Sequence, residues 1–279
     1  MNSKFYKNEK FQAWFFPILY FLLAVSIIIT GTFIFKKKYY MPIVVTGRSM
    51  WPTLAGGIGS GEMEIEDGTT VTGHCRYHYG LADLHTSSVN ELKRFDVLVT
   101  YYPQSWGTDG DEQHYIQNRS YKIKRVWGFP GETINLSFDN EAKTYTFTAS
   151  KNGNLLYKIT SKPVSNYTIE YEGEYRDAQS VMHYGTLSFT HNAAEFDLPY
   201  KSFKVINSKR EIVNKTLAND EYYVMGDNWS ASTDCYEKSS VEKLTKSYLQ
   251  GRVISITANV SYYNNVTSNM HEIPERHDF

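Results

Sequence analysis

The stretch "YKIKRVWGFPGETI", residues 121–134, alternates in side-chain character and then turns at Gly-Phe-Pro-Gly. Alternation with a period of two is typical of a β-strand, and Gly and Pro commonly form the turn that follows. In such a strand Lys122 and Lys124 lie on one face, while Ile123 and Arg125 lie on the other. Two interpretations stay open: an exposed edge strand protected by lysines, or a core-facing strand that buries a lysine.

Other segments extend the prediction to a mainly β, antiparallel fold. Aromatic residues make up 15% of the chain, which favours strands. Strands are predicted over four further segments, 94–102, 143–149, 221–225 and 252–263. Asn152-Gly153 predicts a hairpin turn, and a Ser cap with a terminal Gly predicts a short helix over residues 239–251.

Length and composition exclude several classes of protein. The 279 residues allow one or two domains with a substantial core. The formal net charge is -1, so the basic excess of a nucleic-acid binder is missing, and no nucleic-acid partner is expected. Two cysteines, Cys75 and Cys235, are too few for a disulfide scaffold, and whether they pair stays open.

Residues 11–35 form an uncharged apolar stretch of 25 residues. As a helix it is roughly 37 Å long, enough to cross a bilayer, and it is too long for a cleavable signal peptide. A buried soluble helix is the alternative. Three lysines precede the stretch and three follow it, so the lysine count gives no orientation. No second stretch of this length follows, so residues 39–279 are expected on one side of the membrane.

Residues 47–54, "GRSMWPTL", place Ser49 between Arg48 and Met50. Ser and Pro are ordinary loop formers, so a plain turn is one interpretation. The other is a serine nucleophile, which needs a base, and none of the eight histidines stands in a context that pairs it with Ser49. Because only about one lysine in 2,500 is neutral at pH 7 at its ordinary pKa, a lysine base must be buried, as a core-facing Lys124 would be.

A third stretch, "EYYVMGDNWSASTD" at 221–234, is by itself typical of a strand and an Asx-rich turn. Together and in this order, the three stretches resemble the type I signal peptidases. In that family S-M-x-P-T-L holds the nucleophile, K-R-V-x-G-x-P-G begins with the general-base lysine, and G-D-N-x-x-x-S-x-D completes the site. Here they read "SMWPTL", "KRVWGFPG" and "GDNWSASTD", and "RFDVLVTYYP" and "GRV" match two further motifs.

The resemblance implies a role for each matching residue. Ser49 attacks the scissile carbonyl, and Lys124 takes its proton. The backbone N–H of Ser49 is one oxyanion donor. It also implies supporting residues. Ser232 orients the lysine amine, and Arg125 forms an ion pair with Asp227. Asp234 is the second aspartate of the last motif.

The chain departs from the family pattern at several positions. Gly47 stands where some members have a serine whose hydroxyl is the second oxyanion donor. Trp229, Cys235 and Tyr236 stand where the last motif commonly has Arg, Ser and Arg. Because Tyr236 replaces the last of these, Asp234 lacks the arginine that usually pairs with it.

The 75 residues from Ser49 to Lys124 exceed the spacing of compact members, so an insertion is expected within 55–93. It contains four residues that could be interpreted as metal ligands, His74, Cys75, His78 and His85. Their spacing matches no closed zinc pattern, so solvated loop side chains are expected and no metal is predicted.

Met50 and Trp51 are expected close to the substrate and the membrane. Ser49 lies 13 residues after Lys36, which limits its distance from the span to roughly 43 Å along an extended chain. Trp favours the membrane interface, so partial burial of Trp51 in lipid is one hypothesis. The alternative is that both pack in the core, or that Met50 lines the substrate pocket.

The resemblance also implies an architecture and an activity. It implies an extracytoplasmic antiparallel β catalytic domain, of the type shared by signal peptidases and repressor proteases, behind one transmembrane helix. The activity is that of a serine endopeptidase that cleaves signal peptides from exported preproteins, with membrane lipid as the other partner and no cofactor. The expected segments are a cytoplasmic N-terminus (1–10), a transmembrane helix (11–35), a catalytic core (39–132 and 221–265), an inserted β subdomain (133–220) and a polar tail (266–279).

Two rivals remain. A self-cleaving Ser–Lys repressor protease shares the dyad, but it needs a DNA-binding module and no membrane anchor. A non-catalytic assembly factor for pili or surface proteins, built on the same fold, is the alternative from another class. The presence of both Ser49 and Lys124 argues against it.

Overall fold

The computed structural model describes residues 9–54, 62–64, 70–73, 77–106, 121–163, 165–176, 179, 181–199, 202–206, 209–238, 242–260 and 277–278. The chain divides into two compact units, Met1–Met41 and Pro42–Phe279.

The first unit consists of helix α1 (Glu9–Tyr39), which contains the whole uncharged stretch. Among the described residues it is the one helix long and apolar enough to cross a membrane, and none of its most apolar part is buried within the protein. This finding favours a membrane span over the alternative of a buried soluble helix. Lys36, Lys37 and Lys38 occupy the last turn, where positive charge interacts favourably with the helix dipole.

The second unit contains an eight-stranded sheet in which β6 is an interior strand. The order is β1-β4-β16-β5-β6-β14-β15, with β17 also paired to β16. The strands are β1 (Tyr40–Val44), β4 (Tyr77–Asp83), β5 (Val97–Thr100), β6 (Lys122–Gly128), β14 (Glu221–Met225), β15 (Leu244–Thr245), β16 (Leu249–Val260) and β17 (His277–Asp278). Antiparallel neighbours flank β6 on both sides, β5 through Lys124↔Leu98 and β14 through Arg125↔Met225. The edge-strand interpretation of this stretch is therefore wrong.

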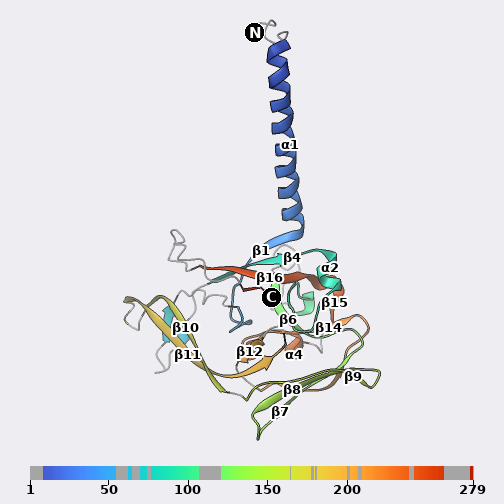
Figure 1. Cartoon of the computed structure of the whole chain (residues 1–279). Helices are drawn as coiled ribbons and strands as arrows, with labels where there is room; N and C mark the ends of the chain where they lie inside the picture. Colours follow the sequence, from blue (N-terminus) through green and yellow to red (C-terminus); the bar gives the residue numbers. More distant parts are fainter. Residues whose placement is uncertain are drawn as a thin grey trace. The chain divides into compact units, whose positions relative to one another are not determined.

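Two smaller sheets complete the unit (Figure 1). The five-stranded sheet has the order β12-β11-β10-β3-β2, and in Figure 1 its strands β10 and β11 form a long ribbon. The four-stranded sheet has the order β13-β7-β8-β9. Their strands are β2 (Glu62–Glu64), β3 (Thr70–Gly73), β7 (Thr133–Asp139), β8 (Thr144–Lys151), β9 (Asn154–Thr160), β10 (Ser165–Arg176), β11 (Met182–Asp197), β12 (Ser202–Ile206) and β13 (Ile212–Thr216).

The mainly β, antiparallel fold is confirmed, with some local differences. Asn152 and Gly153 both have positive φ and connect β8 to β9, as the hairpin signal predicts. The helix expected over 239–251 is wrong as a continuous element in its described part: Leu244 pairs with Tyr222 in β14 and β16 begins at Leu249, so the short 3-10 helix at Lys246–Tyr248 is what forms between them. The other short elements are α2 (Thr86–Asn90), η2 (Gln104–Trp106), α4 (Cys235–Lys238) and η3 (Lys246–Tyr248).

Trp127 joins the three sheets in one core. It lies on β6, and its ring centroid is 5.2 Å from that of Phe147 on β8, 5.6 Å from Phe196 on β11 and 5.9 Å from Phe203 on β12. All four side chains are buried. The strands of residues 133–220 therefore share a core with β6, while the limits of the proposed inserted subdomain stay a prediction.

Trp127→Ala should lower the free energy of unfolding by about 3–5 kcal/mol, because it removes the ring that all three sheets contact. Leu155→Ala on β9 is the control. That side chain is 61% exposed, so its loss should change the free energy by less than about 0.5 kcal/mol. Denaturant unfolding of the full chain in detergent micelles, followed by circular dichroism, measures both. Equal losses would contradict the role of Trp127.

Candidate active site

The segment after β1 holds Ser49 by burying its neighbours. Leu54 N–H donates to the carbonyl of Met50 at 2.9 Å, which closes a turn of the chain. Met50 and Leu54 are buried, whereas Ser49 is half-buried. Asn228 N–H donates to the Ser49 carbonyl at 3.0 Å, so the nucleophile segment is tied to the loop after β14.

Trp51 does not lie where the lipid hypothesis expects it. Its side chain is 2% exposed and that of Met50 is 1% exposed. Side chains buried to this degree present no surface to a bilayer, so the expectation of Trp51 in lipid is wrong. Both residues pack in the core, and a role of Met50 in lining the substrate pocket stays a prediction.

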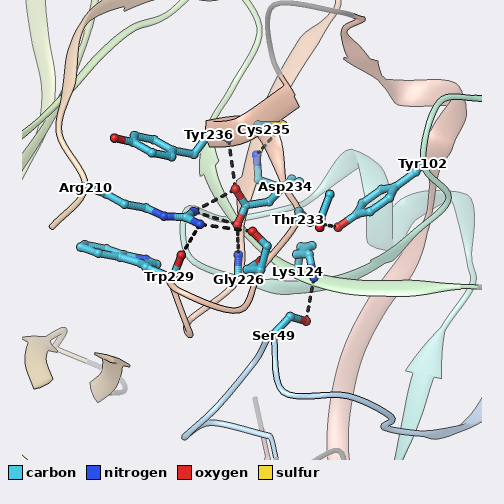
Figure 2. A network of polar contacts seen from close by, with 12 residues as sticks. Ser49, Tyr102, Lys124, Arg210, Gly226, Trp229, Thr233, Asp234, Cys235 and Tyr236 are labelled. Carbon is cyan, nitrogen blue, oxygen red and sulfur yellow. Dashed lines mark hydrogen bonds and ion pairs between the residues drawn. The ribbon is translucent and has the colours of Figure 1, made fainter. Parts of the chain in front are cut away.

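Lys124 Nζ lies 2.7 Å from Ser49 Oγ (Figure 2). The lysine lies on β6 and is 3% exposed. Burial lowers the pKa of Lys124 from its ordinary value of 10.5 to about 8. A neutral amine at this distance can accept the hydroxyl proton of Ser49.

Arg125 and Asp227 form the ion pair that the resemblance implies. Arg125 Nε lies 2.8 Å from Asp227 Oδ1, and Nη2 lies 2.5 Å from Oδ2. Both side chains are fully buried, and Arg125 also donates to the carbonyl of Phe95. The Thr53 hydroxyl donates to Asp227, which links this pair to the nucleophile segment.

Gly226 lets the loop after β14 approach Ser49 closely. A Cβ at this position would lie 2.3 Å from the Ser49 carbonyl oxygen and 2.3 Å from Ser232 Oγ. The Ser232 hydroxyl is buried beside the site, but it has no hydrogen-bond partner among the described residues. Its role in orienting Lys124 therefore stays a prediction.

Asp234 has an arginine partner that the motif did not indicate. Arg210 Nη1 lies 2.8 Å from both carboxylate oxygens of Asp234, and both side chains are buried (Figure 2). The Tyr236 ring lies over the guanidinium, with its centroid 4.7 Å from Arg210 Cζ. Nothing in the sequence signals this pair, because Arg210 lies outside the matching motifs.

Tyr102 is a second residue that the motif comparison did not single out. Its hydroxyl donates to the carbonyl of Thr233, and its ring centroid lies 5.9 Å from Lys124 Nζ. Burial raises the pKa of Tyr102, so the phenol stays protonated and remains a donor.

Only some of the possible metal ligands and cysteines lie in the described part of the chain. In the described part of the chain, no three His, Cys, Asp or Glu side chains are placed to hold a metal ion. His74 and Cys75 lie outside the described residues, and His85 Nδ1 lies 2.5 Å from Asp83 Oδ1. Cys235 is a free, buried cysteine whose thiol pKa is raised by burial.

Gly226→Ala should lower turnover of a preprotein, the substrate that the resemblance implies, by at least about tenfold, because the methyl group displaces Ser49. Gly153→Ala is the control: its φ is 80°, but open space surrounds the new methyl group. That variant should cost about 1–2 kcal/mol of stability and leave turnover unchanged. Cleavage rates and unfolding curves of both variants test this, and unchanged turnover in Gly226→Ala would contradict it.

A comparison with known protein families supports the interpretation of the three sequence motifs. Residues 13–257 match the family described as signal peptidase, peptidase S26, a range that begins in α1 and ends in β16. A comparison with curated proteins finds no match. The matched range includes Ser49, Lys124 and Asp234, and the antiparallel β architecture agrees with it. The chain belongs to the signal peptidase family, peptidase S26.

Proposed function

We propose that the protein is a membrane-bound serine endopeptidase that removes signal peptides from exported preproteins with a Ser–Lys dyad. The observation that carries the proposal is the 2.7 Å distance between a buried lysine amine and Ser49 Oγ. A lysine exposed to solvent would be protonated at neutral pH and could not serve as a base.

In the proposed reaction, neutral Lys124 accepts the proton of the Ser49 hydroxyl while Oγ attacks the scissile carbonyl carbon. The negative charge on the carbonyl oxygen is stabilised by the backbone N–H of Ser49. Breakage of the C–N bond leaves an ester on Ser49, and protonated Lys124 gives its proton to the departing amine. Lys124 then activates a water molecule that hydrolyses the ester and restores the free serine. Apart from the substrate and the water molecule, every group in this proposed scheme belongs to the chain, so the scheme needs no cofactor.

The proposed substrate is a preprotein whose signal peptide is held in the same bilayer as α1. Family membership and the apolar helix together indicate a single-pass membrane protein. We place the N-terminus in the cytoplasm and the catalytic unit outside, where exported chains emerge. Small residues at the first and third positions before the cut would be selected by shallow apolar pockets that exclude larger side chains.

Ser49→Ala and Lys124→Met should each reduce kcat by at least about 10⁴-fold, and the double variant should lose little more, because nucleophile and base act as one unit. Lys122→Met is the matched control, since it removes a lysine two positions away on the same strand. At pH 9 it should retain turnover within a few-fold. Cleavage of a preprotein by the full chain in detergent measures all four. Absence of cleavage by the wild type would favour the non-catalytic assembly factor.

The pH dependence of kcat/KM should show an acid limb with a midpoint at about pH 8, the pKa of Lys124. The sign follows from the role of the amine: the neutral form is active, so activity falls as pH falls through the midpoint. The ammonium of Lys122 lowers the pKa of Lys124, so Lys122→Met should move the limb to higher pH. A wild-type limb near the ordinary lysine value would mean that the amine is solvated.

A further inference from the structure

Two buried carboxylates act on Lys124, and each is paired with an arginine. Asp227 pairs with Arg125, the neighbour of the lysine on β6, and Asp234 pairs with Arg210, which lies between β12 and β13. We propose that Arg210 is a positioning residue of the active site: it fixes the loop Gly226–Asp234 and neutralises Asp234, so that Lys124 can act as a base. The inference rests on the proposed function, since it concerns the base of that reaction.

Arg210 binds the loop at three points. Nη1 contacts both carboxylate oxygens of Asp234, while Nη2 donates to the carbonyls of Trp229 at 2.6 Å and Ser232 at 3.2 Å. Figure 2 shows the Arg210 guanidinium beside Asp234 and Trp229. An arginine can hold three partners at once because its donors form a rigid planar fork, which a lysine lacks.

The Asp234 carboxylate, held by Arg210, in turn binds the backbone of the loop that contacts Ser49. It accepts hydrogen bonds from the backbone N–H of Gly226 at 2.9 Å and from that of Tyr236 at 3.1 Å. Gly226 is the residue that approaches the Ser49 carbonyl, and Asn228 of the same loop donates to that carbonyl. The contacts therefore run without a gap from Arg210 to the backbone of the nucleophile.

The same arrangement accounts for the tyrosine at 236, where the family motif commonly has an arginine. With the cation supplied by Arg210, Tyr236 can place its ring over the guanidinium instead. A cation over an aromatic face is attractive, so the tyrosine stabilises the replacement partner. The positive charge opposite Asp234 is thus provided from another segment of the chain.

The charges of the pair act on Lys124 with opposite signs. Burial has the largest effect and lowers the pKa of Lys124, Asp234 raises it, and Arg210 lowers it. Without Arg210, the Asp234 carboxylate would favour the protonated amine. Among the described residues, six groups contact the amine or influence it electrostatically: Ser49, Tyr102, Lys122, Asp227, Asp234 and Arg210.

The test compares variants of the full chain in detergent by the midpoint of the acid limb of kcat/KM for a preprotein. Arg210→Met leaves Asp234 without its cation, so the midpoint should rise by about half a pH unit or more. Asp234→Asn leaves the guanidinium uncompensated, so the midpoint should fall by a similar amount. The double variant removes both charges and should return close to the wild-type midpoint.

Two further variants separate this role from a merely structural one. Arg210→Lys keeps the cation but loses the fork, so it should keep the midpoint and lower kcat. Arg94→Met removes an arginine whose side chain is 10% exposed and which pairs with Glu132 at 2.7 Å, and Arg94 is not among the charges that shift the pKa of Lys124 most. It should lower the unfolding temperature without moving the midpoint.

A second readout does not depend on activity. The ¹³Cε signal of Lys124 in lysine-labelled protein, assigned by its loss in Lys124→Arg, reports the same midpoints without substrate. If the wild type cleaves no preprotein, the proposed function fails, while the order of these midpoints still decides the role of Arg210. Equal midpoints in all variants, or shifts of Arg210→Met and Asp234→Asn in the same direction, would overturn the inference. If Arg210→Met does not fold, the midpoints of Asp234→Asn and Arg210→Lys are compared instead. The inference is overturned if the midpoint of Asp234→Asn is equal to or higher than that of Arg210→Lys.

Discussion

The burial of Lys124 on an interior strand is the constraint around which the rest of the site is arranged. An ammonium ion removed from water is costly, and burial therefore favours the neutral amine. β5 and β14 pair with β6 on its two sides, Lys124 is buried, and Ser49 Oγ lies within hydrogen-bond distance of the amine. Lysine is rarely buried in a protein interior, but here burial keeps more of the amine neutral, and the neutral amine can act as a base.

Buried charges around that amine occur as pairs. An unpaired carboxylate in the interior would be destabilising and would also favour a protonated lysine. Arg125 neutralises Asp227 and Arg210 neutralises Asp234, in both cases with direct contacts. Both the stability of the fold and the proposed chemistry therefore require that these carboxylates be neutralised. Two arginines from different segments of the chain neutralise them.

Much of the site could be predicted because it lies in short, contiguous motifs. Ser49, Lys124 and the Arg125–Asp227 pair come together as the resemblance implies, and the Asn152-Gly153 turn forms where its dipeptide predicts. Predictions failed where packing or pairing with the rest of the fold decided the outcome. Leu244 pairs with β14 instead of continuing a helix, and Trp51 is taken into the core instead of the membrane interface.

By itself the sequence determined the apolar span, the antiparallel β class and the identities of the proposed nucleophile and base, because each depends on local periodicity or on a contiguous motif. Only the tertiary structure decided which strand of the sheet is interior, how close Gly226 comes to Ser49, and which arginine pairs with Asp234. These features depend on contacts between segments far apart in the chain. The sequence around Arg210 does not indicate that it pairs with Asp234. Only the folded chain shows the two side chains 2.8 Å apart.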